Sequence, residues 1–295
     1  MTIEGLKHRH LIKLLASCEM GQLYYLIFPR AEGGNLHEFW VRQDKTPRTQ
    51  DLVLWSVEQL FGLIDAVWAL HEANLLHGDV GPDNILHFTD PGSRGYGRRG
   101  TLVLTGFAWP EYDNSKTGLR SADTTMLLSK CEPYYKTPEA VDHFKNNRPR
   151  SRRYDMWCTG CLLLEHIIWL LYGFSSLQTF RKWTCYRRTI PQGYFFQQKS
   201  RSSAKMEVHP EVHKAFSHLR QDPCCADGTA LGDVLDQINH RLLVIEPEQR
   251  ATAQELHSRI LEVLIKGWGD PSYLFKDLPA DATPPIPEFF LQGPE

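Results

Sequence analysis

Two long apolar stretches constrain the fold of this chain more than any other feature of its sequence. From Leu52 to Leu70 the apolar residues recur at the spacing of an α-helix with one buried face. The second stretch, Asp155 to Tyr172, also predicts a helix, and its most hydrophobic part extends from Cys161 to Phe174. We interpret both stretches as helices that are buried in the core of a globular protein.

The second stretch does not fit a membrane span. It is shorter than the roughly 20 apolar residues that cross a bilayer, and it carries Glu165 and His166 near its middle. The N-terminal residues Met1 to Arg9 include charges and no apolar run, so no signal peptide is predicted. We therefore expect an intracellular protein, cytoplasmic or nuclear, without a membrane partner.

The composition is that of an ordinary globular protein. Of the 295 residues, 42% are hydrophobic and 23% are charged, with a net charge of −2, which excludes a disordered tail protein and argues against a nucleic-acid partner. The seven cysteines are an odd count, which favours a reducing compartment over a disulfide framework. Cys158 and Cys161 have the spacing of half a zinc site, but no second pair matches them, so we expect buried helix cysteines.

The rest of the chain predicts short strands, further helices and a Pro-rich end. Strands are expected at Leu11–Leu15, Leu23–Phe28 and Thr101–Thr105, with a Gly/Arg-rich hairpin tip at Gly92–Gly100 before the last of them. An amphipathic stretch lies at Leu36–Val41, and helices are expected at Leu231–Ile245 and Ala251–Ile265. From Asp270 onward we expect an extended or partly disordered tail.

A polar loop between short apolar runs reads H-G-D-V-G-P-D-N-I-L, from His77 to Leu86. It resembles the catalytic loop of the protein kinase superfamily, whose pattern is H-R-D-L-K-P-E-N-I-L. The H-G-D tripeptide alone also resembles the phosphotransferases that act on aminoglycosides and choline. One loop therefore leaves both branches open.

Three further motifs favour the protein kinases. Tyr135–Glu139 resembles Y-x-A-P-E, Asp155–Gly160 resembles D-x-W-x-x-G, and Pro247–Thr252 resembles the late D-P-x-x-R-x-T. The small-molecule phosphotransferases lack these three. The resemblance covers Leu11 to Ile265 and implies an α+β, protein kinase-like fold, mainly the helical C-lobe with a partial β N-lobe.

The resemblance also implies a division of the chain. We expect a partial N-lobe and hinge at 1–34, a kinase-like C-lobe with an insertion near 174–230 at 35–268, and a Pro-rich tail at 269–295. Leu6–Ile12 resembles the stretch just after the family's N-lobe helix. In the family the Gly-rich loop, the strand Lys and the helix Glu all precede this stretch, so the resemblance is to a degenerate kinase-like domain that is truncated at its N-terminus.

Four residues are expected to hold the fold rather than to react. The resemblance implies that Glu139 is paired with Arg250 in a bidentate ion pair. Asp155, at the start of its helix, can accept hydrogen bonds from exposed N–H groups and tie them to the loop. His77 is the first residue of the loop, and we expect it to hold the fold as well.

The resemblance assigns two residues to phosphoryl transfer. Asp79 stands where the family orients the substrate hydroxyl, and Asn84 stands where it holds a metal ion. Both residue types also hydrogen-bond the backbone of such a loop. Their presence is therefore compatible with a structural role as well as with catalysis.

Three glycines replace groups that the family uses. Gly106, in the stretch T-G-F-A, replaces the metal-binding carboxylate of D-F-G and cannot ligate magnesium, which wants oxygen ligands. Gly81 replaces the loop Lys, and Gly78 replaces the loop Arg. The expected active centre therefore lacks its main metal ligand and the positive charges of the family's loop Lys and Arg.

A nucleotide site survives in the sequence only in part. The resemblance places Phe28 and Ala31 at the hinge, with Leu86 and Leu104 below the adenine. ATP and magnesium are the cofactors that it implies, and their binding is expected to be weak or absent.

These observations favour a pseudokinase, a kinase-fold binding or scaffold module that acts on a protein partner through its surfaces. The first alternative is an active Ser/Thr kinase that transfers the ATP γ-phosphate to a protein hydroxyl, with Asp79 orienting the hydroxyl and Asn84 on the metal. The second is a small-molecule phosphotransferase, favoured only by His77–Asp79.

Overall fold

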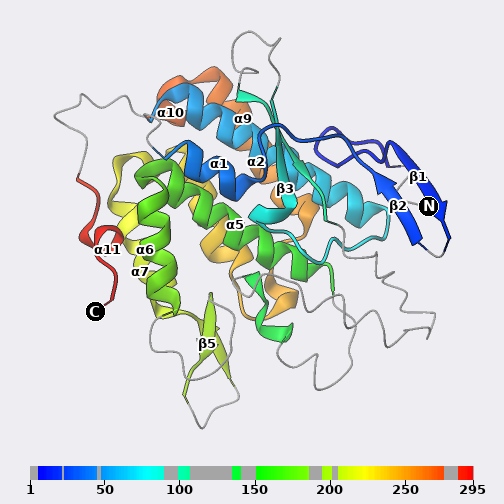
Figure 1. The fold of residues 1–295 in the computed structure, drawn as a ribbon. Coiled ribbons are helices and arrows are strands. Elements are labelled where there is room, and N and C mark those ends of the chain that lie inside the picture. Colours follow the sequence, from blue (N-terminus) through cyan, green and yellow to red (C-terminus); the bar gives the residue numbers. More distant parts are fainter. Residues whose placement is uncertain are drawn as a thin grey trace.

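The fold is seen in a computed structural model that describes residues 6–21, 23–44, 48–89, 99–106, 135–140, 151–185, 195–200, 205–275 and 285–294 (Figure 1). The Gly/Arg-rich turn at 90–98 and the polar stretch at 107–134 lie outside these residues. Phe107 and Ala108 of the T-G-F-A stretch therefore also lie outside the described residues.

The core is built on the two helices that the apolar periodicity predicts. Helix α2 (Gln50–Glu72) begins where the Thr49 hydroxyl accepts the Leu52 N–H, and α5 (Arg153–Tyr172) is buried along almost its whole length. Figure 1 shows α2 with α9 (Ala253–Gly269) against it, and the two helices are in contact. Cys158 and Cys161 lie on α5 and are buried, as expected.

Helix α2 is the only described helix that is long and apolar enough to cross a membrane. In the fold, however, 72% of its most apolar window is buried inside the protein. This burial is that of a core helix.

The other described helices surround this core. They are α1 (Leu36–Arg42), α6 (Phe174–Cys185), α7 (Pro210–Gln221), α8 (Ala230–Gln237), α10 (Pro271–Leu274) and α11 (Glu288–Leu291). The expected helix at Leu231–Ile245 is shorter, since α8 passes into a π-helical turn at Ile238–Leu242. Helix α9 begins at Thr252, whose hydroxyl and the Glu255 carboxylate form a reciprocal capping box.

The first strand does not lie where the sequence predicts it. The hairpin consists of β1 (Ala16–Met20) and β2 (Leu23–Ile27), joined by a turn in which Gly21 has a φ of 66°. The strand prediction for Leu11–Leu15 is wrong, since these residues form no strand of their own. Leu11 and Ile12 are instead buried against the C-terminal lobe. They add to the edge of another strand, and the Ile12 N–H donates to the Leu104 carbonyl at 2.9 Å.

A narrow layer of extended chain lies beside the H-G-D loop. Strands β3 (Ile85–Phe88) and β4 (Thr101–Leu104) pair antiparallel, with Ile85 opposite Leu104 and Leu86 opposite Val103. Residues 10–12 flank β4, and residues 33–35 flank β3 through two hydrogen bonds between backbone groups of Gly33, Gly34 and His87. The third pair, β5 (Phe196–Gln198) and β6 (Met206–Val208), lies in the segment between α6 and α7.

Two described parts of the C-terminal tail, α10 and α11, are helical, where the proline content predicts an extended or partly disordered segment. Tyr273 and Leu274 of α10 and Phe290 of α11 are buried, with 3%, 3% and 1% of their surface exposed. The tail is anchored because these aromatic and aliphatic side chains are removed from water. Residues 276–284 lie outside the described chain.

A buried histidine in α5 makes the stability of the fold depend on pH. His166 is fully buried, and its Nδ1 accepts the Trp40 indole N–H at 3.2 Å. Burial lowers the pKa of this imidazole to about 3 from 6.5. The unfolded chain therefore takes up a proton below pH 6.5 that the folded chain refuses, and stability falls as the pH drops.

We predict that His166→Gln reduces this pH dependence. The variant keeps an acceptor for Trp40 but removes the titration, so the slope of the free energy of unfolding between pH 4.5 and 6 falls by about 1.4 kcal/mol per pH unit. Urea unfolding at several pH values measures the slope. His240→Gln is the control, because the His240 side chain is 67% exposed, and an unchanged slope in His166→Gln would contradict the assignment.

Candidate functional site

The H-G-D loop connects the end of α2 to β3, and one buried carboxylate holds its backbone. The Asp155 Oδ2 atom accepts the His77 N–H at 2.9 Å, and Oδ1 accepts the Gly78 N–H at 2.8 Å. His71, on the last turn of α2, donates its Nε2–H to Oδ2 at 2.9 Å. Asp155 thus ties the loop to both core helices.

The charge on Asp155 is stabilised by the groups it binds. Burial alone raises the pKa of this carboxyl, but the hydrogen bonds that it accepts from the His71 ring and the Gly78 N–H outweigh this effect. The net effect lowers the pKa below its ordinary value of 3.8. The carboxylate therefore stays ionised and continues to accept hydrogen bonds across the ordinary pH range.

His77 links the loop to the residue just before Gly106. Burial lowers the pKa of its imidazole, so the ring is neutral near pH 7. Its Nδ1 accepts the Asp79 N–H at 3.2 Å, which leaves the proton on Nε2, and Nε2 donates to the Thr105 carbonyl at 2.9 Å. The ring therefore fixes the loop relative to the end of β4.

Asp79 and Asn84 lie together, as the resemblance implies. The Asn84 Nδ2 group donates to the Asp79 carboxylate at 2.7 Å and to the Asp79 carbonyl at 2.9 Å. A short 3-10 turn, Pro82–Asn84, brings them together, and the Asn84 N–H donates to the Gly81 carbonyl. The Asn84 amide nitrogen is thus engaged within the loop, and Asp79 is half-buried.

The Asn84 amide oxygen occupies the space in front of Gly106. A Cβ atom built on Gly106 would lie 2.1 Å from Asn84 Oδ1, and Gly106 has a φ of 75°, where side chains are strained. A carboxylate at this position therefore needs a different arrangement of Asn84. Among the described residues 99–106, which include β4 and Gly106, there is no acidic side chain.

The other two glycines differ in what they would tolerate. Gly81 has extended backbone with a φ of −170°, and a Cβ there would contact the Tyr135 ring at 3.4 Å, an ordinary distance. Gly78 has a φ of 77°, which favours glycine over the arginine of the family pattern.

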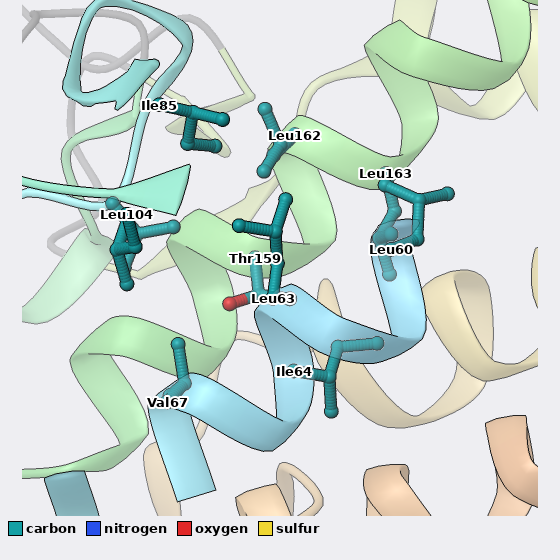
Figure 2. A pocket seen from close by; sticks show the side chains of 10 residues that line it. Leu60, Leu63, Ile64, Val67, Ile85, Leu104, Thr159, Leu162 and Leu163 are labelled. Atoms are coloured by element: carbon teal, nitrogen blue, oxygen red, sulfur yellow. The ribbon is translucent and has the colours of Figure 1, made fainter. Parts of the chain in front are cut away.

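The expected adenine residues do not all lie on one face. Leu104 is fully buried, and Figure 2 shows its side chain with Ile85 facing Leu63 and Val67 across a small apolar cavity of about 10 Å³. It packs in the core between β4, α2 and α5, so its side chain has no exposed surface in the structure. Since Leu86 alternates with Ile85 along β3, it faces the opposite side and is half-buried.

The hinge residues lie beyond β2. Phe28 is 40% exposed and Ala31 is half-buried, and both precede the Gly33–Asn35 segment that flanks β3. That these two residues and Leu86 contact a base stays a prediction.

Glu139 and Arg250 form a bidentate ion pair at 2.7 and 2.8 Å. The Arg250 guanidinium also donates to the carbonyls of Val244, Ile245 and Arg153, and it lies 5.0 Å from the centre of the Trp157 ring. Every part of this buried cation is therefore paired, which stabilises the C-terminal lobe. The pair lies in the scaffold and not among the loop residues.

Sequence reasoning missed a second buried ion pair next to the loop. Glu165 accepts the Tyr135 hydroxyl at 2.7 Å and two Arg181 N–H groups at 2.9 and 2.5 Å. Burial and the Glu165 charge raise the pKa of Tyr135, whose ring also meets Gly81. The signal was a glutamate inside an apolar stretch, since a buried carboxylate requires a partner.

The comparisons with known proteins agree with this geometry. The family model described as "Protein kinase domain" matches residues 1–260. The chain belongs to the protein kinase superfamily. The family and the α+β kinase fold expected from the four motifs are thereby confirmed, while the proposed domain boundaries and residue roles stay predictions.

The relatives are serine/threonine-protein kinases and other protein kinases. Serine/threonine-protein kinase PLK4 of Drosophila grimshawi is 27% identical over 55% of this chain and 18% of its own length. Serine/threonine-protein kinase 36 of Pongo abelii is 28% identical over 55% of this chain and 10% of its own length. Aurora kinase C of Mus musculus is 23% identical over 74% of this chain and 70% of its own length. The chain therefore covers less than a fifth of the first two relatives.

The contrast between Gly106 and Gly81 gives a matched pair of substitutions. We predict that Gly106→Ala lowers the free energy of unfolding by about 1–3 kcal/mol, because the new Cβ requires a strained φ and displaces Asn84. Gly81→Ala is expected to be neutral or to raise it by about 0.4–1 kcal/mol, because its backbone is already extended. Urea unfolding of both variants measures the difference, and equal values would show that the space before Gly106 is open.

Proposed function

We propose that this protein is a pseudokinase, a kinase-fold module that binds a protein partner and does not transfer phosphate. The observation that carries the proposal is Gly106, where the metal-binding carboxylate of the family is replaced and the Asn84 oxygen fills the space. Magnesium prefers an octahedron of oxygen ligands, usually with carboxylates and substrate phosphates among them. Asp79 and Asn84 remain as candidate ligands. They are joined to each other by a hydrogen bond from Asn84 Nδ2 to the Asp79 carboxylate.

The loop also lacks positive charge where the transferred phosphate would develop negative charge. Gly81 takes the place of the family's lysine and lies against the Tyr135 ring. Phosphoryl transfer depends on positioning and on charge neutralisation by metal ions and cationic side chains. ATP and magnesium are therefore proposed to bind weakly or not at all.

The surface of the β1–β2 hairpin supports a binding role. Leu23, Leu26 and Ile27 are 61%, 57% and 48% exposed, and Met20 beside the turn is 67% exposed. A two-stranded hairpin is marginally stable on its own, and apolar side chains that stay exposed on both faces of such a hairpin favour a site that binds another protein. We expect the protein partner to cover this hairpin. An intracellular location, cytoplasmic or nuclear, stays a prediction.

A second candidate function is phosphoryl transfer to a protein Ser or Thr. The arrangement of the loop favours it, because Asn84 holds the Asp79 carboxylate by a hydrogen bond and Asp79 is only half-buried. In this case Asp79 orients the substrate hydroxyl and Asn84 contributes to a metal site. The Ser/Thr kinases among the relatives support this alternative by analogy.

The test is the turnover of labelled ATP by the purified chain, with magnesium or manganese and a general protein substrate. We expect no transfer above background and no nucleotide-dependent rise in the melting temperature, because the metal carboxylate is absent. Asp79→Asn is the control that separates this protein's activity from a contaminating kinase. Turnover that disappears in Asp79→Asn would overturn the proposal and support the active kinase.

A further inference from the structure

The C-terminal segment binds across three helices on the side of the molecule away from the H-G-D loop. Helix α11 (Glu288–Leu291) lies beside α6 and α7 in Figure 1, and it contacts α6 directly. Three side chains receive it, and we call them the aromatic platform: Tyr172 at the end of α5, Trp183 on α6 and His218 on α7.

Phe289 lies between two rings of the platform. Its ring stacks on the Trp183 indole at 5.8 Å with an angle of 9°, and on the His218 imidazole at 5.1 Å with an angle of 17°. Near-parallel stacking on two partners fixes both the position and the plane of the ring. This position therefore selects a flat aromatic side chain.

Phe290 provides the buried anchor. It is 1% exposed, and its ring lies 5.0 Å from Tyr172 and 6.2 Å from His218, the latter edge-on. Two neighbouring aromatic residues thus occupy two different sites on one platform, and His218 contributes to both.

Trp183 recognises the backbone of the segment as well. Its indole N–H lies 3.0 Å from the Phe289 carbonyl and 3.0 Å from the Gln292 carbonyl. Phe289 lies within the turn of α11, and Gln292 is the extended residue that follows the turn, so the indole N–H spans its C-terminal end. The platform therefore reads a single helical turn that carries adjacent aromatic residues.

The helices that form the platform also bury side chains of their own in the main core. Helix α6 buries Leu177 and Phe180, and α7 buries Val212 and Phe216. The tail adds Phe290 to this core, and Ile286 and Phe289 pack against it. The segment thus contacts the protein through a short stretch of chain, as a bound peptide does.

We propose that the aromatic platform is a peptide-docking site and that residues 286–292 are a ligand bound in cis. The partner it fits is a protein segment with two adjacent aromatic residues in one helical turn. Such a segment competes with the chain's own tail, which is present at a high effective concentration because it is tethered. This site is separate from the H-G-D loop and does not depend on whether the loop transfers phosphate.

The experiment removes the two aromatic side chains of the tail from the 295-residue chain, which leaves the platform vacated. In Phe289→Ala/Phe290→Ala the tail loses both rings, and a fluorescein-labelled peptide of residues 285–292 is titrated and followed by fluorescence polarisation. We expect the vacated chain to bind the peptide at least tenfold more tightly than the unaltered chain. Adding Trp183→Phe, which keeps a ring but removes the N–H donor, should weaken the binding at least fivefold, and a peptide with both Phe replaced by Ala should not bind.

Equal or undetectable binding by a vacated chain that still melts cooperatively would overturn the proposal, because the tail would then be a structural element only. A second measurement covers a vacated chain that does not fold. Hydrogen exchange of residues 288–292 in the unaltered chain should become faster with millimolar peptide, and unchanged exchange would also overturn it. A dimer that the alanine variant abolishes would instead assign the platform to the tail of a second copy and contradict the partner proposed here.

Discussion

The buried carboxylate of Asp155 is the interaction on which the arrangement of this molecule depends. It stands at the start of α5, the helix with the largest share of buried residues, and it accepts the N–H groups of His77 and Gly78 and the His71 ring. An ionised carboxylate inside a protein is stable only when such donors surround it. Its position therefore fixes the loop against the core, and β3 continues directly from that loop.

The contacts that hold the loop are distinct from those that would perform chemistry. His77 ties the loop to the end of β4, and Asn84 ties Asp79 to its own backbone, so the loop is complete as a hydrogen-bonded unit. None of these contacts needs a carboxylate at Gly106. A kinase fold can thus keep the geometry of its catalytic loop while the metal ligand is absent, and this separation is the physical basis of the proposed pseudokinase.

Much of this architecture could be predicted from the sequence, because helix periodicity and motif order are properties of contiguous residues. Features that depend on register or on distant partners could not. Leu11–Leu15 looks like a strand, yet its first residues add to β4. The inward direction of Leu104 follows from its pairing with Ile85, which the sequence does not encode locally. The proline content of the tail also concealed the anchoring of Phe290.

The central claim is that the site does not bind a divalent metal ion tightly. A measurement of manganese binding tests this claim most directly. Electron paramagnetic resonance of Mn²⁺, titrated with the purified chain and a non-hydrolysable ATP analogue, counts the bound metal without requiring turnover. We expect the spectrum of the manganese–nucleotide mixture to remain unchanged as protein is added. Protein-bound manganese with a micromolar Kd that disappears in Asn84→Ala would contradict the account.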